Sequence, residues 1–145
     1  YLYDTYGWQA FQENFSKKHA KLFDGLRVDS GDNFEAVDKI VGKYTELGIA
    51  PQAKAVTFSN GLTVDDAIAI HEYCKGKVRD NYGIGTYLTG DITGVQPMNI
   101  VIKLTAAKLT EKKNWQKAIK LSDDRSKYTG DPDEVEIARK TLHIE

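Results

Sequence analysis

The chain has 145 residues, 41% of them hydrophobic and 28% charged, which is an ordinary composition for one globular domain with a buried core. Its 20 Lys and Arg residues balance 21 Asp and Glu residues, which argues against a nucleic-acid partner. No apolar run approaches the roughly 20 residues that span a bilayer, which argues against a membrane partner. The only cysteine, Cys74, cannot form an internal disulfide, so the sequence predicts a cytoplasmic protein.

The chain opens with a short segment, residues 1–3, that is typical of the end of a strand. A strand needs neighbours for its backbone groups and no initiator Met is present, so we expect residues upstream of Tyr1 to be missing. Asp4 and Thr5 are then expected to cap a helix that runs from about residue 6 to residue 20.

Strands and helices alternate in the next part of the chain. Strands are predicted at residues 25–28, 55–58 and 77–82. Helical spacing of apolar residues predicts one helix near residues 34–44 and another after the capping box of Thr63 and Asp66. Such repeats imply parallel strands with right-handed crossovers, so the predicted fold class is α/β.

The pattern changes after Pro97. Residues 99–104 and 118–121 are predicted to form two strands of an antiparallel hairpin, with a turn at residues 111–114. Pro132, with acidic residues beside it, is expected to begin a short terminal helix that runs to about Thr141.

Polar residues gather where the predicted parallel strands end. These segments are Asp4, Asp29–Asp32, Ser59–Asn60 and Gly83–Thr86. Because ligands bind at the carboxyl ends of parallel strands, the four segments together predict one ligand face. Each segment could instead be only a turn or a helix cap, and this simpler reading is favoured for Asp32 and Thr63.

Two of these segments carry groups suited to a phosphorylated sugar. Arg27 and Asp29 alternate on one strand, so their side chains point to the same face. They could form a simple ion pair, or Arg27 could bind phosphate oxygens while Asp29 takes ribose hydroxyls or Mg²⁺. The glycines of Gly83–Thr86 could let backbone N–H groups approach a phosphate, or the loop could be a plain turn.

The histidines do not suggest a catalytic or metal site. No two of them have metal-ligand spacing, so no metal-binding residue is predicted. His71 is expected to be a packing residue on a helix face that also carries Val64, Ala67 and Ile68.

Six motifs occur in a recognisable order, at residues 4–6, 25–32, 58–62, 82–86, 98–104 and 120–123, and residues 127–132 add a seventh similar segment. Together they resemble the carboxyl-terminal part of the nicotinate phosphoribosyltransferases, which are type II phosphoribosyltransferases. The resemblance implies that residues 1–97 form the carboxyl-terminal portion of an irregular α/β barrel of parallel strands, with its phosphoribosyl-binding loops. It implies that residues 98–145 form a β-hairpin and a terminal helix that complete the other domain of the enzyme.

The resemblance also implies roles for single residues. Asp4 stands where the family has an acidic residue near the pyridine ring. Arg27 and Asp29 match a pair that contacts the phosphoribosyl group, and these three residues are the predicted catalytic residues.

Four further residues are predicted to bind substrate. Ser59 and Asn60 match a loop beside the ribose, and Gly85 and Thr86 match the loop that holds the 5′-phosphate. Many relatives have Asp at position 60, and an amide is a poorer ligand for Mg²⁺, so Asn60 is assigned to the ribose hydroxyls.

The reaction implied by the resemblance joins nicotinate to phosphoribosyl pyrophosphate and yields nicotinate mononucleotide and pyrophosphate, in NAD salvage. Mg²⁺ is the implied cofactor, and ATP is an implied co-substrate that acts through a phosphohistidine upstream of this segment. The implied partners are the two substrates, the missing amino-terminal part of the protein and a second copy in a homodimer. The segment alone is expected to be incomplete and inactive.

Two other functions remain open from the sequence. The chain could belong to a nicotinamide- or quinolinate-specific relative, although residues 83–86 and the apolar strand after Pro97 favour the nicotinate enzymes. It could also be a non-catalytic ligand-binding fragment.

Overall fold

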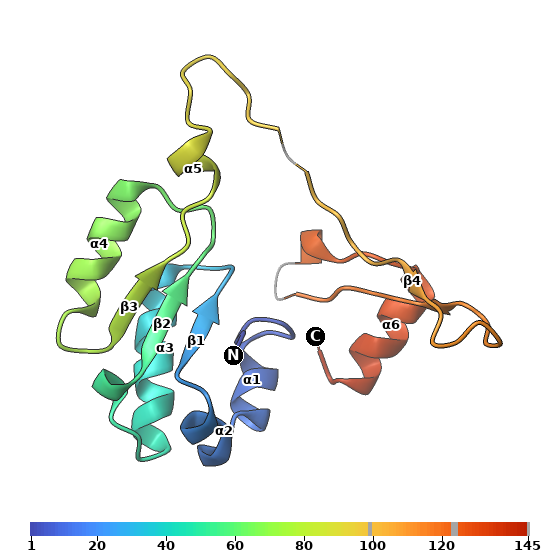
Figure 1. Ribbon diagram of the computed structural model, residues 1–145. Helices are drawn as coiled ribbons and strands as arrows, with labels where there is room; N and C mark the ends of the chain where they lie inside the picture. Colours follow the sequence, from blue (N-terminus) through green and yellow to red (C-terminus); the bar gives the residue numbers. More distant parts are fainter. Residues whose placement is uncertain (99, 123–124, 145) are drawn as a thin grey trace.

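The computed structural model describes residues 1–98, 100–122 and 125–144 (Figure 1). We call residues 1–90 the sheet region and the described residues from 91 onward the arm region. The helices are α1 (Trp8–Asn14), α2 (Lys17–Leu22), α3 (Asn33–Glu46), α4 (Val64–Cys74), α5 (Thr86–Thr89) and α6 (Pro132–Thr141), with short 3-10 helices η1 (Pro51–Ala53) and η2 (Arg125–Lys127). The strands are β1 (Gly25–Val28), β2 (Ala55–Phe58), β3 (Arg79–Tyr82), β4 (Ala106–Ala107) and β5 (Gln116–Lys117).

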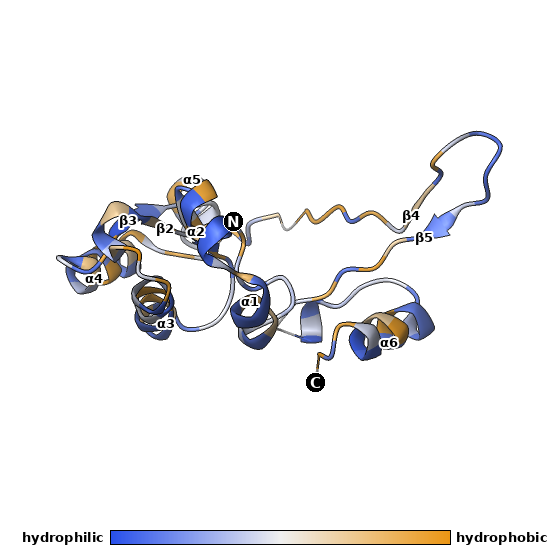
Figure 2. Cartoon of the chain, turned by 90° about the horizontal axis from the view of Figure 1, so that it is seen from below, coloured by the Kyte–Doolittle hydropathy of each residue, from blue (hydrophilic) through white to orange (hydrophobic). Residues whose placement is uncertain are grey.

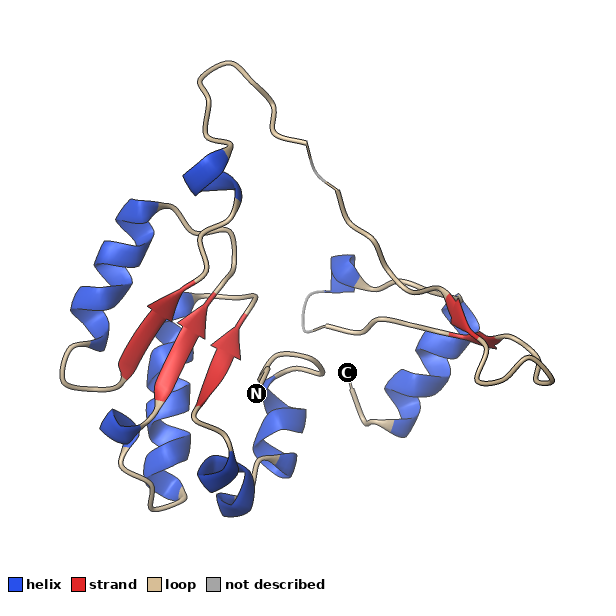
Figure 3. Ribbon diagram, viewed as in Figure 1, coloured by secondary structure: helices blue, strands red, loops and turns tan. Residues whose placement is uncertain are grey.

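The larger sheet is parallel and has the strand order β1-β2-β3. Gly25 pairs with Ala55, which in turn pairs with Arg79. On the outer side of β1, Leu2 forms an isolated parallel bridge with Arg27, so the first residues extend along the sheet as predicted. The predicted α/β class and the parallel pairing are confirmed, and the three strands by themselves form an open sheet (Figure 3).

The core of the sheet region lies on one face of this sheet. Alternate strand residues point into it, and α3 supplies the residues that cover them; these members, all at most 2% exposed, are Leu26, Val28, Val56, Phe58, Val37, Ile40 and Tyr44. The other face carries Arg27, Thr57 and the small residues Gly25 and Ala55, none of which is buried. One face of the sheet is therefore sealed by helices, whereas the other keeps exposed polar groups.

The helix predicted from residue 6 to residue 20 is wrong in its length and its cap. It is two helices, because Phe15 is extended (φ −83°, ψ 90°) and Ser16 begins α2 with a new cap. Gly7, with φ of 87°, precedes α1, so neither Asp4 nor Thr5 is its cap. Asp4 is instead drawn into tertiary hydrogen bonds, which a local pattern does not reveal.

Helices α3 and α4 begin where their sequence signals predict. The carboxylate of Asp32 accepts the Glu35 N–H at 2.8 Å, and Thr63 with Asp66 forms the predicted capping box. Gly48 ends α3 with a φ of 65°, a backbone conformation that suits glycine.

The buried face of α4 was predicted wrongly, because the helix presents a different side to the sheet. Ala67 is buried as expected, but the other core residues of α4 are Ile70 and Cys74, while Ile68 is 57% exposed. His71 is therefore not a packing residue: its ring reaches outward to Asp80 on β3. The spacing Ala67, Ile70, Cys74 is as helical as the predicted one, so only packing against the sheet selected it.

The arm region contains an antiparallel hairpin, but its pairing differs from the prediction. β4 pairs with β5 through residues 106–107 and 116–117, closer to the turn than expected, and residues 100–104 form no strand. Residue 99 lies outside the described residues. Lys120 pairs with Thr129 in an isolated antiparallel bridge, so the predicted second strand finds a different neighbour.

The last helix agrees with the sequence. α6 runs from Pro132 to Thr141, and the Asp131 side chain accepts the N–H groups of Asp133 and Glu134. Along the extended segment before β4, Figure 2 shows apolar stretches in orange, and the side chains of Ile100, Ile102 and Leu104 there are exposed. Among the described residues, no helix has the length and apolar character to cross a membrane.

Candidate functional site

The site is built around Asp4, which lies beyond the end of the bridge between Leu2 and Arg27. Its side chain is only 4% exposed. One carboxylate oxygen accepts the backbone N–H of Asp29 at 3.1 Å and a hydrogen bond from the Ser30 hydroxyl. Asp4 therefore joins the end of the first extended segment to the loop after β1, although 25 positions separate Asp4 from Asp29.

Arg27, Asp29 and Ser59 form a closed triangle of hydrogen bonds. Arg27 Nη2 lies 2.7 Å from Asp29 Oδ1, and Arg27 Nε donates to Ser59 Oγ at 2.9 Å. Ser59 Oγ lies 2.8 Å from the same Asp29 oxygen, so its single proton can complete the triangle. The ion pair, one of the two alternatives that the sequence left open, is present, and the Arg27 side chain is still 53% exposed.

The environment of Asp29 keeps it ionised. Partial burial raises the pKa of Asp29, but hydrogen bonds from Ser59 and Arg27, with the positive charges of Arg27 and Lys127, outweigh this and leave that pKa below its ordinary value. At neutral pH the site therefore presents a carboxylate.

Asn60 lies next to this triangle and is tied to the loop after β1. Its amide group donates to the Gly31 carbonyl at 3.0 Å. Its amide oxygen, Oδ1, is buried and accepts no hydrogen bond from any residue that the structure describes. The amide nitrogen of Asn60 is thus held by a hydrogen bond, whereas its amide oxygen has no donor among the described residues.

The glycine loop follows β3 at the same end of the sheet. The Gly83 N–H donates to the Phe58 carbonyl at 2.8 Å, and a Cβ on Gly83 would lie 3.3 Å from Ser59 Cβ, so the loop passes close to β2. Gly85 precedes the first turn of α5, and Thr86 is exposed. No hydrogen bond within the described part of the chain joins Gly85 or Thr86 to Asp4, Arg27 or Asp29.

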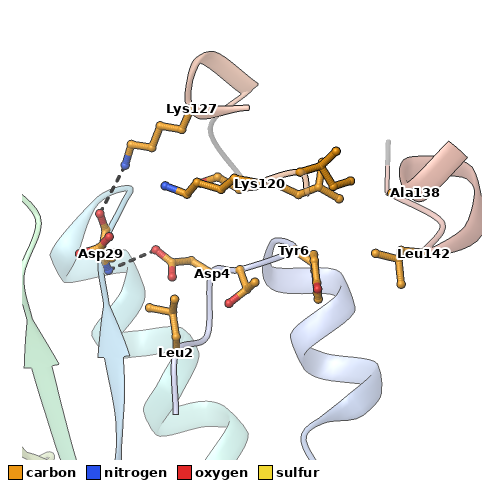
Figure 4. Close-up of a pocket in the computed structure, with 12 residues that line it drawn as sticks. Leu2, Asp4, Tyr6, Asp29, Lys120, Lys127, Ala138 and Leu142 are labelled. Carbon is orange, nitrogen blue, oxygen red and sulfur yellow. Dashed lines mark hydrogen bonds between the residues drawn. The ribbon is translucent and has the colours of Figure 1, made fainter. Parts of the chain in front are cut away.

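A cavity of about 300 Å³ lies between the sheet region and the arm region (Figure 4). Asp4 and Asp29 line one side, Lys120 and Lys127 another, and apolar groups that include Leu142 complete it. The Lys127 ammonium lies 3.5 Å from the Asp29 carbonyl oxygen, a contact between residues 98 positions apart. The two lysines lie in the late motifs, but no local pattern assigns them a role, because their approach to Asp4 depends on how the chain folds back.

The whole chain, residues 1–145, matches the model of the nicotinate phosphoribosyltransferase (NAPRTase) family. The chain belongs to this family. It is 48% identical over 141 residues to a nicotinate phosphoribosyltransferase of Desulforapulum autotrophicum, with 97% of this chain and 36% of that protein covered. It is 45% identical over 143 residues to one of Chromohalobacter salexigens, with 99% of this chain and 36% of that protein covered.

Solved structures of the NAPRTase family have the same fold over this segment. The crystal structure of nicotinate phosphoribosyltransferase from Porphyromonas gingivalis matches with a TM-score of 0.90 and 47% identity, covering 99% of this chain and 37% of that one. The structure from Vibrio cholerae matches with a TM-score of 0.88 and 34% identity, covering 99% and 35%. The chain thus spans little more than a third of the length of these NAPRTases.

Side chains of this NAPRTase segment outside the site form a separate polar group. His71 Nδ1 lies 2.8 Å from Asp80 Oδ2, which also accepts the Tyr82 hydroxyl proton at 2.6 Å. Burial and the nearby Asp80 carboxylate raise the pKa of the Cys74 thiol to about 11, so Cys74 is protonated and unreactive at neutral pH. No hydrogen bond within the described residues connects this group to Asp4 or Arg27.

The NAPRTase residues described here do not assemble a protein site for Mg²⁺. No group of three or more His, Cys, Asp and Glu side chains among them could hold a metal ion. Asp4 already accepts two hydrogen bonds and Asp29 is engaged by Arg27 and Ser59. The donor set therefore does not fit an ion held by this segment alone.

Proposed function

We propose that the longer protein to which this segment belongs is a nicotinate phosphoribosyltransferase. It would transfer the phosphoribosyl group of phosphoribosyl pyrophosphate to nicotinate, releasing pyrophosphate and forming nicotinate mononucleotide for NAD salvage. The names of the relatives in the preceding section support nicotinate as the acceptor over nicotinamide or quinolinate. A role as a non-catalytic ligand-binding fragment has no comparable support.

The observation that carries this proposal is the row of polar groups at the carboxyl end of the sheet. Asp4 follows the segment that bridges β1, Arg27 lies on β1, and Asp29 comes directly after β1. Ser59 and Asn60 follow β2, and the glycine loop follows β3. Neighbouring strands are about 4.8 Å apart, so the row extends over roughly 10 Å from β1 to β3, a length suited to a ribose with anionic groups at both ends.

In this proposal Arg27, Asp29 and Asp4 act on the reacting end of the ribose. Breaking the bond between ribose C1 and pyrophosphate gives C1 a positive, oxocarbenium-like character, as in glycoside cleavage. The buried Asp4 and the ionised Asp29 supply negative charge nearby, and Arg27, oriented by Asp29 and Ser59, neutralises oxygens of the phosphoribosyl group. The protein contributes position and charge, without a covalent intermediate on these residues.

Ser59, Asn60, Gly85 and Thr86 would hold the rest of the phosphoribosyl group. Asn60 is assigned to the ribose hydroxyls by its place in the loop after β2, where its amide group is held by the Gly31 carbonyl. The N–H groups at the start of α5 have no acceptor within that helix, and the Thr86 hydroxyl adds a donor, so this loop suits the 5′-phosphate.

The proposal includes Mg²⁺ and ATP only outside this segment. Mg²⁺ commonly binds to substrate phosphates with few protein ligands, so it would enter with the pyrophosphate of the donor. ATP hydrolysis would act through a histidine in another part of the protein. His19, His71 and His143 are not candidates, and His71 is engaged with Asp80.

We extend the proposal to the architecture of the whole protein. The exposed polar face of the sheet, with Arg27 and Thr57, suits the interior of an α/β barrel, and strands from the rest of the protein would close it. The exposed apolar side chains of Met98, Ile100, Val101, Ile102 and Leu104 suit a second domain built with the arm region. A homodimer and a cytoplasmic location complete the proposal.

The first experiment is a turnover assay on the full-length protein with nicotinate and nicotinamide in competition. We expect nicotinate mononucleotide as the product, whereas no mononucleotide under any condition would end the proposal. The 145-residue chain alone should be inactive, because it spans little more than a third of its relatives.

Two substitutions test the residues assigned to the donor. Arg27→Ala should lower kcat/KM by about 100-fold or more, the usual cost of removing a group that stabilises developing charge. Gly85→Asp should weaken binding of the mononucleotide, because a carboxylate would face the 5′-phosphate. Unchanged kinetics for Arg27→Ala would leave Arg27 as only an ion-pair partner of Asp29.

A further inference from the structure

Asp4 is held through only one of its two carboxylate oxygens. The Asp29 N–H, at 3.1 Å, and the Ser30 hydroxyl both donate to Oδ2, whereas Oδ1 accepts no hydrogen bond from any described residue. Asp4 also lines the cavity between the sheet region and the arm region (Figure 4). The carboxylate thus has one oxygen fixed by the protein and one oxygen that can still interact with a bound substrate.

Ser30 is placed to fix the orientation of this carboxylate. Ser30 and Asp4 are both buried, so the hydrogen bond between them is shielded from water. The loop that carries Ser30 is itself anchored, because the Asn60 amide group donates to the Gly31 carbonyl at 3.0 Å. Gly31 turns the chain directly after Ser30 with a φ of 77°, which suits glycine. The backbone therefore sets where the Ser30 hydroxyl lies.

The type of donor matters as much as its position. A hydroxyl satisfies a buried carboxylate without cancelling its charge, whereas an Arg or Lys partner would neutralise it. Asp29 has such a partner, because Arg27 pairs with it at 2.7 Å. Asp4 forms no ion pair with any residue that the structure describes, and its side-chain donor is the neutral Ser30. The charge of Asp4 therefore remains available to a positive centre in the substrate.

We propose that Ser30 is a positioning residue for Asp4 in phosphoribosyl transfer. By holding Oδ2, the Ser30 hydroxyl keeps Oδ1 directed toward C1 of the bound ribose. This inference rests on the proposed function, and it adds to that function a residue that touches neither the substrates nor the reacting atoms. Ser30 itself forms and breaks no covalent bond, and it acts only through the orientation of Asp4.

The reaction explains why this orientation should affect the rate more than the binding of the donor. The bond between C1 and the pyrophosphate oxygen breaks with both electrons going to pyrophosphate, while the lone pair of the pyridine nitrogen forms the new bond to C1. C1 is most positive while the first bond is broken and the second is incomplete. A directed carboxylate attracts C1 at that stage, but it gains little from the anionic donor beforehand. Loss of the Ser30 hydroxyl should therefore lower kcat and not raise KM.

The test uses the full-length protein with Ser30→Ala, which removes the hydroxyl, and Ser30→Thr, which keeps it. Ser16→Ala, at the exposed N-cap of α2, is the matched control for the loss of a serine hydroxyl. For each variant we would measure kcat and the KM for phosphoribosyl pyrophosphate, with a thermal melt to establish that the variant is folded. Asp4→Asn, alone and combined with Ser30→Ala, completes a double-mutant cycle.

We expect Ser30→Ala to lower kcat by about tenfold or more, the usual effect of losing a hydrogen bond to a charged group. The KM for the donor should stay within about twofold of the wild-type value. Ser30→Thr should recover kcat to within about threefold of wild type, because it restores the donor. In the Asp4→Asn background, Ser30→Ala should lower kcat by less than about twofold, because Ser30 acts through the carboxylate. Ser16→Ala should leave kcat and KM unchanged.

Four results would overturn the inference. They are an unchanged kcat in Ser30→Ala, a raised KM without a fall in kcat, a folded Ser30→Thr that recovers nothing, and an undiminished loss in the Asp4→Asn background. If Ser30→Ala does not fold, Ser30→Cys decides the result, because its thiol is similar in shape but a weak donor, and it should show the same fall in kcat. Failure of Ser30→Ala to slow an active wild type would remove this role and leave the proposed function standing. A wild type that makes no mononucleotide would overturn both.

Discussion

The sheet region and the arm region both contain many apolar residues but bury them to different extents. All members of the buried cluster come from residues 3–78. In the arm region, Leu121 and Ser122 are the buried residues among those that the structure describes, while Ile100, Ile102 and Leu104 are 71%, 92% and 68% exposed. A strand–helix unit can therefore bury its own apolar face, whereas an extended apolar segment needs a surface from another part of the protein.

The largest expected effect tests the core of the sheet region. Phe58→Ala should lower the free energy of unfolding of the 145-residue chain by about 3–5 kcal/mol, because it opens a cavity at a fully buried site on β2. Urea unfolding measures this change. Ile102→Ala in the same chain is the control and should cost less than about 0.5 kcal/mol. If the two variants lowered the free energy of unfolding equally, the two regions would not differ in how far they bury their apolar side chains.

The second prediction moves Ile102→Ala into the full-length protein. If the rest of the protein covers the arm, this substitution should now cost about 2 kcal/mol or more. The substitution is identical in both proteins. Any difference in the free energy of unfolding that it costs therefore measures how far the rest of the protein buries residue 102. A cost that stays near zero in the full-length protein would mean that residue 102 remains exposed there.

The third prediction compares one helix cap from each region. Thr63→Ala should destabilise the whole sheet region by about 1 kcal/mol, because it removes the capping box of a helix that is packed on the core. Asp131→Ala removes the cap of α6 and its ion pair with Lys117, and should act only locally. Hydrogen exchange separates them: faster exchange throughout the sheet for the first, and in α6 alone for the second.

The smallest expected effect is a pH dependence at the junction of the two regions. The pKa of Asp29 is lowered in the folded protein, so over the interval between its folded and unfolded values the unfolded chain binds more protons. Its stabilising contribution is present above the ordinary carboxyl pKa of about 3.9 and is lost as the pH falls through the lower folded value. The effect is small because the side chain is 38% exposed and therefore screened by solvent.

Urea unfolding of wild type and Asp29→Asn at several pH values measures this dependence. The wild type should be the more stable protein near neutral pH, and the two proteins should converge as the pH falls through the lowered pKa of Asp29. Asp133→Asn, on the exposed first turn of α6, is a control without contacts to Arg27. A difference that does not depend on pH would show that the charge of Asp29 contributes no stability.

Much of the sheet region and the last helix of the arm region could be predicted from short stretches of sequence. The strands 25–28 and 55–58, the caps at Asp32 and Thr63 and the helix from Pro132 to Thr141 all depend on neighbours within one or two turns, and all are confirmed. The predictions failed where packing decides. Periodicity allowed several faces for α4, a continuous helix before β1 and a longer hairpin, and only contacts with the sheet or the rest of the chain chose among them.

Local sequence patterns were enough to predict which residues end the parallel strands, and therefore that Asp4, Asp29, Ser59 and Asn60 lie at one edge of the sheet. They were enough because strand direction and crossover handedness follow from local alternation. Only the tertiary structure decided how these groups are connected: Asp4 to the Asp29 N–H, Arg27 to Ser59, and Lys127 to the Asp29 carbonyl across 98 positions. Contacts at such separations depend on how the whole chain closes and packs, which no local period encodes.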